Sequence, residues 1–161
     1  MQTKLIPTSV PNAIEIVLNA LNAGELIAFP TDTVYGIGTF AFSAEGATKI
    51  YQAKQRPPDK ALPILLGDVS QISLVAVNLP EAAHKLAVHF LPGALTLVVP
   101  KHPSIPAEVS SLQTVGIRIP DHDFARALLN AAGPMAVTSA NISGADSPVD
   151  AEAVYQQLNG S

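Results

Sequence analysis

Short apolar runs alternate with amphipathic segments along this chain, and that alternation limits its possible folds more than any other feature. The runs predicted to be strands span residues 26–29, 62–66, 95–99, 115–119 and 135–137. The segments predicted to be helices span residues 11–23, 43–54, 80–90, 123–132 and 150–158. Runs this short suit strands, while an apolar stripe with the helical period suits a helix against a core. The pattern predicts an α/β fold with a sheet flanked by helices, and it leaves strand order and pairing open.

Several residues mark the expected ends of the helices. Ser43 is a favourable N-cap, and the Pro57-Pro58 pair prevents the second helix from continuing. Pro80 suits the first position of a helix, where its missing N–H is not needed. Residues 69–75 give only a weak signal for a short helix or turn.

Composition restricts the kinds of ligand site that the chain can form. Its 161 residues suit a single domain, 1–161, and 48% of them are hydrophobic, which is enough for a core. The net charge of −4 gives no overall basic field for nucleic acid, so anions must be bound by local cations. The absence of cysteine excludes disulfides, thiol nucleophiles and cysteine zinc sites.

The distribution of apolar residues also indicates a compartment. The first ten residues hold one lysine and no apolar stretch of the kind found in signal peptides. The longest apolar runs have the length of strands, so no membrane span is expected. We therefore expect a cytoplasmic protein.

The first of three polar stretches follows the strand at 26–29. It reads Pro-Thr-Asp-Thr-Val-Tyr-Gly-Ile-Gly at 30–38. Ligands of α/β proteins collect where strands end, and small residues with hydroxyl groups let a backbone approach and orient a ligand. The alternative is a turn in which Asp32 bonds its own backbone, and the local pattern alone favours this turn.

The second polar stretch concentrates positive charge just after a predicted helix. Lys54, Arg56 and Lys60 lie within seven residues, in a chain with nine lysines and arginines. They could be solvated charges that favour the helix C-terminus. They could also form a cradle for a polyphosphate, stiffened by the two prolines. The composition supports both interpretations equally.

The third polar stretch follows the strand at 135–137. It contains Thr138, Ser139 and Asn141, and Asp146-Ser147-Pro148 comes shortly after. Hydroxyl and amide groups can hold a phosphate or a ribose without adding charge. A turn-rich loop that caps the last helix is the commoner use of such residues.

Arg118 interrupts the apolar strand at 115–119. An arginine in a strand is usually solvated on one face, and a buried one needs an anionic partner. A bidentate clamp on a ligand carboxylate is the functional alternative. The sequence contains no Walker-type loop, dinucleotide fingerprint, nucleophile elbow or paired-histidine zinc helix.

Five stretches taken together resemble the YrdC/Sua5 family, over roughly residues 11–158. They are Pro-Thr-Asp-Thr-Val-Tyr-Gly at 30–36, Lys-Gln-Arg-Pro at 54–57, Pro-Gly-Ala-Leu-Thr at 92–96, Thr-Val-Gly-Ile-Arg at 114–118 and Ser-Ala-Asn-Ile-Ser-Gly at 139–144. Each is weak alone, and their order and spacing carry the resemblance. It implies one YrdC-like domain, a twisted mixed sheet flanked by helices with a ligand cleft on its concave face.

The resemblance also implies a reaction. L-Threonine, bicarbonate and ATP would give threonylcarbamoyl-adenylate and pyrophosphate, for the t6A modification of adenosine 37 in tRNA by a downstream threonylcarbamoyl transferase. Mg2+ is the expected helper of ATP, and no protein metal site is implied. The implied catalytic residues are Lys54, Arg56, Ser139 and Asn141. The implied ATP contacts are Arg56, Lys60, Thr114, Ser139, Asn141 and Ser147, and the implied threonine contacts are Thr31, Arg118 and Val137.

Two departures from the family pattern accompany this resemblance. Leu65 stands where many members carry a histidine that helps to hold threonine, and the sequence stops at Ser161, before the family's usual C-terminal strand. Other interpretations remain: a non-catalytic RNA- or nucleotide-binding module with weak tRNA or double-stranded RNA binding, or a paralogue that makes another acyl-adenylate. A carbamoyltransferase of the hydrogenase-maturation type is disfavoured, because those proteins also carry cysteine zinc modules.

Overall fold

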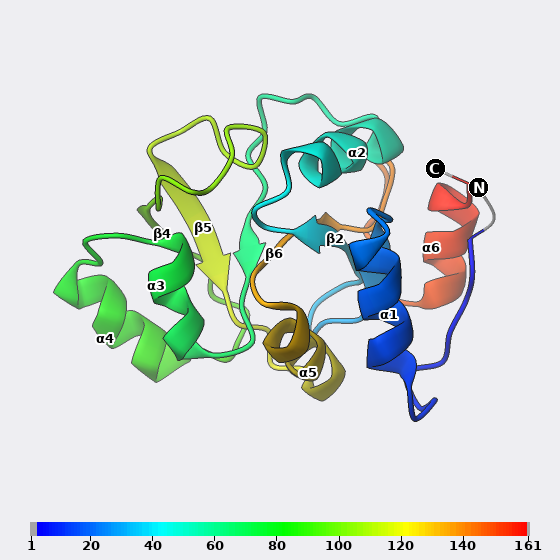
Figure 1. Ribbon diagram of the computed structural model, residues 1–161, viewed down its shortest axis with the longest axis horizontal. Helices are drawn as coiled ribbons and strands as arrows, with labels where there is room; N and C mark the ends of the chain where they lie inside the picture. The colour runs from blue at the N-terminus through cyan, green and yellow to red at the C-terminus, as the bar shows by residue number, and fades with distance from the viewer. Residues whose placement is uncertain (1–2, 161) are drawn as a thin grey trace.

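One six-stranded sheet organises the molecule (Figure 1). The computed structural model describes residues 3–160. The strands are β1 (Ile27–Phe29), β2 (Gly36–Phe40), β3 (Ile64–Leu65), β4 (Leu97–Pro100), β5 (Thr114–Arg118) and β6 (Met135–Ser139). They lie in the order β1-β2-β6-β3-β5-β4, and only β3 and β5 are parallel neighbours. The predicted α/β class with a mixed sheet is confirmed.

The helices fall where the apolar periodicity predicts them. They are α1 (Ala13–Asn22), α2 (Ala44–Lys54), α3 (Ile72–Val75), α4 (Glu81–Phe90), α5 (Asp123–Ala132) and α6 (Ala151–Leu158), with a 3-10 turn η1 (Val69–Gln71) before α3. Ser43 caps α2 by accepting from the Gly46 N–H at 2.9 Å. Pro80 directly precedes α4 as its N-cap, one position earlier than predicted.

Strand β2 was not among the predicted strands, and its first three residues lie in the polar stretch at 30–38, for which the local pattern favours a turn. Gly36 and Gly38 are required by the close approach of β6. A Cβ at position 36 would lie 2.6 Å from Val137 Cγ1, and one at position 38 would lie 2.8 Å from Val137 Cγ2. The large valine on one strand therefore fits against glycine on the next, and glycine serves a strand here rather than a turn.

The two faces of the sheet are covered differently. Helices α1 and α5 pack on one face against Leu65, Met135 and Val137. The opposite face carries Ile64 and the residues of neighbouring strands that point to the same side as Ile64. These side chains pack in a larger cluster with residues of α2, α3 and α4. Figure 1 shows α1 and α5 lying together, near β2 and β6 and away from β4. On β4 the side chain of Val98 is 72% exposed, so the α1–α5 face is open there.

No helix in residues 3–160 combines the length and the apolar composition that crossing a membrane would require.

Candidate active site

A small cavity lies where the open part of the sheet meets the loop between β1 and β2. Its volume is about 110 Å³, and it is lined by Thr31, Thr33, Val34, Tyr35, Gly36, Pro63, Leu65, Thr96, Arg118, Val137, Thr138 and Ser139. Strands β2, β3, β5 and β6 all contribute to it. It is large enough for several water molecules or one small ligand. All three residues predicted to contact threonine, Thr31, Arg118 and Val137, line this cavity.

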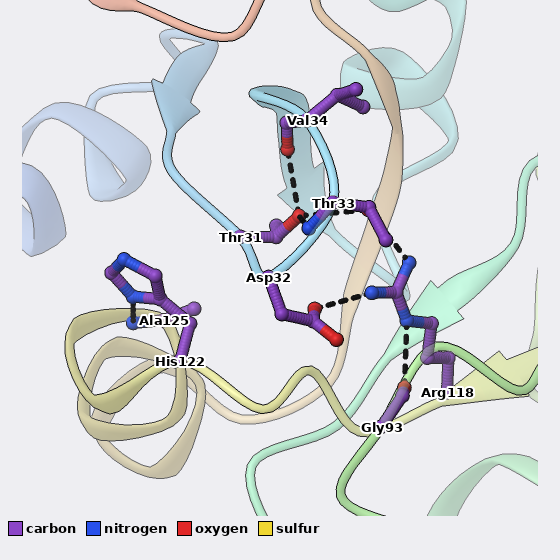
Figure 2. A network of polar contacts seen from close by, with 8 residues as sticks. All are labelled: Thr31, Asp32, Thr33, Val34, Gly93, Arg118, His122 and Ala125. Carbon is purple, nitrogen blue, oxygen red and sulfur yellow. Dashed lines mark hydrogen bonds and ion pairs between the residues drawn. The ribbon is translucent and has the colours of Figure 1, made fainter.

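Arg118 forms the cationic wall of the cavity (Figure 2). Its Nε donates to the Gly93 carbonyl at 3.0 Å, and its Nη1 donates to Thr33 Oγ1 at 3.1 Å. Its Nη2 forms an ion pair with the Asp32 carboxylate. The side chains of Arg118 and Asp32 are only 14% and 16% exposed. The expected anionic partner of a part-buried arginine is therefore present, and it comes from the first polar stretch.

The loop that carries Asp32 is held by its threonines. Thr31 Oγ1 donates to the Val34 carbonyl at 2.7 Å and accepts from the Thr33 N–H at 3.2 Å. The turn expected at this stretch is therefore stabilised by Thr31, while Asp32 points to Arg118 (Figure 2). Across the loop's end, the Tyr35 carbonyl accepts from the Ala140 N–H at 2.8 Å, which joins the first polar stretch to the third.

Lys54 joins the second polar stretch to the third from inside the protein. Its side chain is 1% exposed, and its Nζ donates to the carbonyls of Ser139 and Asn141, each at 2.5 Å. The Lys54 carbonyl accepts from the Ser143 N–H at 2.8 Å. Burial, and then the positive charge of Arg56, lowers the pKa of the Lys54 ammonium to about 8. The ammonium thus fixes the backbone on both sides of Ala140.

Asn141 keeps one buried acceptor without a donor. Its side chain is 5% exposed, and its Nδ2 donates to the carbonyls of Ile142 and Ala145 at 2.8 and 2.9 Å. Its Oδ1 has no hydrogen-bond partner. Buried acceptors are almost always satisfied in proteins, and an unsatisfied one lowers stability. This oxygen is therefore suited to a donor supplied by a ligand.

Arg56 lies in a different environment from Arg118. It follows α2 and lines a second cavity of about 260 Å³ together with Thr48, Tyr51, Gln52, Pro58 and Glu108. Its Nε donates to the Lys60 carbonyl and its Nη2 to the Ala61 carbonyl, both at 3.3 Å. Lys60 itself is exposed. The three clustered cations therefore differ in environment: Lys54 is buried, Lys60 is exposed, and Arg56 is not among the residues that line the cavity walled by Arg118.

The other predicted nucleotide contacts come from β5, β6 and the loop before α6. Ser139 lines it. Thr114, at the opposite end of β5 from Arg118, shares the face of Arg118 because alternate strand residues project to the same side. Ser147 is exposed in the loop before α6. Leu65 lines the cavity where a family histidine was expected, and its apolar side chain packs on the α1–α5 cluster.

Three contributions to the site were not predicted from the sequence. Asp32 was not recognised as the partner of Arg118, nor Thr33 as an acceptor for it, and the Gly93 carbonyl was not considered. Asp32 lies 86 residues from Arg118 in the chain, so only the fold brings them together. Within residues 3–160, no group of three or more His, Cys, Asp or Glu residues is arranged to hold a metal ion.

Comparison with known proteins identifies the family. The model of the Sua5/YciO/YrdC family, described as telomere recombination, matches residues 19–161. The chain belongs to this family. It is 45% identical to the threonylcarbamoyl-AMP synthase of Bacillus subtilis over 143 residues. The aligned segment covers 87% of this chain and 41% of that protein. It is 41% identical to a putative threonylcarbamoyl-AMP synthase of Mycobacterium tuberculosis over 153 residues. That alignment covers 94% of this chain and 70% of that protein.

A solved structure from the same family shares the fold. The structure of Pyrococcus abyssi Sua5 complexed with L-threonine has a TM-score of 0.88 and 38% identity, over 96% of this chain and 45% of that one. The chain thus spans less than half the length of the Bacillus and Pyrococcus family members. The predicted family membership is confirmed, and the residue roles remain predictions.

Proposed function

We propose that this chain carries the activity of a threonylcarbamoyl-AMP synthase, making threonylcarbamoyl-adenylate and pyrophosphate from L-threonine, bicarbonate and ATP. The observation that carries the proposal is the small cavity walled by Arg118, in a chain 45% identical to a threonylcarbamoyl-AMP synthase. A fold shared with a Sua5 structure that contains L-threonine supports the same assignment.

The cavity has groups suited to each part of threonine. The guanidinium of Arg118 would bind the carboxylate, because arginine presents N–H groups in a geometry that matches carboxylate oxygens. Thr31 and the backbone of Val137 would contact the hydroxyl and amine. Leu65 adds an apolar surface that suits the threonine methyl group.

The ATP site would continue from this cavity along the open sheet face. The Ser139 hydroxyl would donate to the nucleotide near the reacting phosphate, and the unsatisfied Oδ1 of Asn141 would accept from a hydroxyl of its ribose. Thr114 and Ser147 would contact it further away, and Arg56 and Lys60 would bind the phosphates. Lys54 would act in catalysis by holding Ser139 and Asn141 in place, since its own ammonium is enclosed by their carbonyls.

The proposed chemistry brings two anions together. The threonine amine condenses with bicarbonate, releasing water and forming a carbamate. A carbamate oxygen then attacks the α-phosphorus of ATP, the bond from that phosphorus to the bridging oxygen breaks, and pyrophosphate leaves. The nucleophile and the leaving group are both negative, so positive charge and positioning supply most of the catalysis. Mg2+ would arrive bound to the phosphates of ATP, as is usual for this ion at nucleotide sites.

Pyrophosphate release tests the proposal directly. We expect release that requires L-threonine, bicarbonate and ATP together, and that falls to background in Arg56→Ala. Serine and other amino acids serve as alternative substrates that would reveal a different acyl-adenylate product. Full turnover in Arg56→Ala would refute the role of Arg56, and release that is independent of any amino acid would refute the function.

The wider setting of the reaction is also a proposal. The product would pass to a tRNA threonylcarbamoyl transferase in the cytoplasm, and any contact with tRNA or double-stranded RNA would be weak because the chain is acidic. A salt titration of RNA binding measures that contact.

A further inference from the structure

The arrangement around Arg118 separates the contacts that must persist from the contact that can be exchanged. An arginine has two edges that can bind a carboxylate bidentately, Nε with Nη2 and Nη1 with Nη2. In the structure each of the three nitrogens already has one protein acceptor: the Gly93 carbonyl on Nε, Thr33 Oγ1 on Nη1 and Asp32 on Nη2. Nε has a single N–H, so a carboxylate on the Nε edge would have to displace the Gly93 carbonyl. Nη1 and Nη2 each carry a second N–H, so the Nη1–Nη2 edge can take a ligand carboxylate, beside or in place of the present acceptor on Nη1.

The cavity lies on the side of Thr33, not on the side of Asp32. Thr33 and Arg118 both line the cavity, whereas Asp32 does not. Figure 2 shows Asp32 and Gly93 approaching the guanidinium from different directions than Thr33 does. A ligand in the cavity would therefore reach Nη1 first, where the present acceptor is the Thr33 hydroxyl.

The relative strengths of the three contacts favour the same exchange. The guanidinium is charged in either bond, but a carboxylate acceptor adds a full opposite charge that the Thr33 hydroxyl lacks, so replacing the hydroxyl by a ligand carboxylate is favourable. Replacing Asp32 would exchange one carboxylate for another and leave Asp32, which is only 16% exposed, without its cation. Stranding a part-buried charge is strongly unfavourable.

We propose that Asp32 is a positioning residue that holds Arg118 in its carboxylate-binding orientation, and that the Thr33 hydroxyl occupies Nη1 until the substrate carboxylate displaces it. The proposal rests on the function proposed above, because it takes Arg118 as the carboxylate site of the amino acid. Asp32 acts through Arg118 and keeps its bond throughout. Thr33 competes with the substrate for one nitrogen.

The test measures binding of L-threonine by calorimetry and threonine-dependent pyrophosphate release in Asp32→Asn. We expect the Kd and KM for L-threonine to rise about tenfold, while kcat at saturating threonine stays within about twofold and ATP binding does not change. Asp32→Glu keeps the charge and should bind L-threonine more tightly than Asp32→Asn does. Asp121→Asn is the matched control, because Asp121 is exposed close to Arg118 in the chain and the substitution removes the same charge.

Two further variants separate positioning from a general structural effect. In an Arg118→Lys background, Asp32→Asn should change threonine binding by less than about twofold, because the geometry that Asp32 maintains has already been lost. Thr33→Val removes the competing hydroxyl and should tighten L-threonine binding about threefold.

Specific results would overturn the proposal. Unchanged or tighter threonine binding in Asp32→Asn would show that Asp32 does not position the clamp. Thr33→Val that weakens threonine binding tenfold or more would show that the hydroxyl contacts the substrate rather than yielding to it. A wild-type chain that binds ATP but not L-threonine would overturn both this inference and the proposed function, whereas wild-type binding without an Asp32 effect would overturn the inference alone.

Discussion

Arg118 belongs to a strand and Arg56 to a loop, and the two side chains are held by different kinds of partner. Arg118 is paired with a carboxylate and lies in the wall of a small cavity. Arg56 donates to the neutral carbonyls of Lys60 and Ala61, both at 3.3 Å. An ion pair with a carboxylate fixes a guanidinium more strongly than two long bonds to neutral carbonyls do. We therefore expect a rigid amino-acid side and an adaptable phosphate side.

The difference suits the proposed ligands. A small amino acid has few atoms with which to select its site, so its carboxylate needs a clamp that is already oriented before binding. A triphosphate offers many oxygens and several conformations. A loop arginine can exchange weak bonds to carbonyls for strong bonds to phosphate without leaving a buried charge unpaired. The predictions below test this contrast between the two arginines and then the framework around them.

The largest effect is expected from truncating the two arginines separately. Arg118→Ala should raise the Kd for L-threonine by about 30-fold or more, because losing one partner of a part-buried charge pair weakens binding by about 2–5 kcal/mol. It should leave the Kd for ATP alone nearly unchanged. Arg56→Ala should do the reverse, weakening ATP binding and sparing L-threonine.

Calorimetry with each ligand alone measures both effects. Lys85→Ala is the control for lost positive charge, since Lys85 is exposed on α4 and forms an ion pair with Glu81 on the same helix. The proposed division into an amino-acid side and a phosphate side would be wrong if either arginine variant weakened the binding of L-threonine and of ATP equally.

The sequence predicted the surroundings of Arg118 better than those of Arg56, for a physical reason. Arg118 lies in a strand, where alternation fixes the direction of its side chain, so the need for an anionic partner could be inferred. The identity of that partner could not, because Asp32 is distant in sequence and reaches Arg118 only through the order of the strands.

The cations that follow α2 were grouped because they are close in the sequence, and closeness in the sequence does not indicate which way each side chain points. Lys54, Arg56 and Lys60 are close in the chain, but a helix and its end point them differently. Lys54 follows Ala47 and Ile50 by seven and four positions, which is the spacing of the buried stripe of α2. That periodicity was available in the sequence and indicates a buried lysine.

The burial of Lys54 gives the next largest effect, which depends on pH. The pKa of its ammonium is lowered to about 8, whereas its ordinary value is 10.5. Below pH 8 both the folded and the unfolded chain hold this proton, and the folded state keeps a buried charge. Between pH 8 and 10.5 the folded state has released the proton and the unfolded chain still holds it. The free energy of unfolding contributed by this group therefore rises with pH, by at most about 3 kcal/mol.

Urea unfolding at pH 7 to pH 10.5 measures this effect when wild type is compared with Lys54→Met. The methionine variant has a side chain of similar length and no titrating group, so the difference between the two curves isolates Lys54. Wild type should gain stability relative to the variant as the pH rises. Parallel curves for the two proteins would show that the lysine is not held in the buried position described here.

The smallest effect concerns the glycines that shape each region. A Cβ at position 36 would lie 2.6 Å from Val137 Cγ1, and Val137 is both buried and part of the cavity wall. Gly36→Ala should lower the free energy of unfolding by about 1–3 kcal/mol and weaken L-threonine binding, because the valine must move.

Gly144 lies in the loop after Asn141 with a φ of +91° and has no atom within 4 Å of an added Cβ. Gly144→Ala should therefore lower stability by about 1 kcal/mol through backbone strain alone and spare L-threonine binding. The double variant Gly36→Ala, Val137→Ala sharpens the comparison, because removing the valine methyl groups opens the space that the new Cβ needs. It should recover part of the stability lost in Gly36→Ala, and an additive loss in the double variant would exclude the steric explanation.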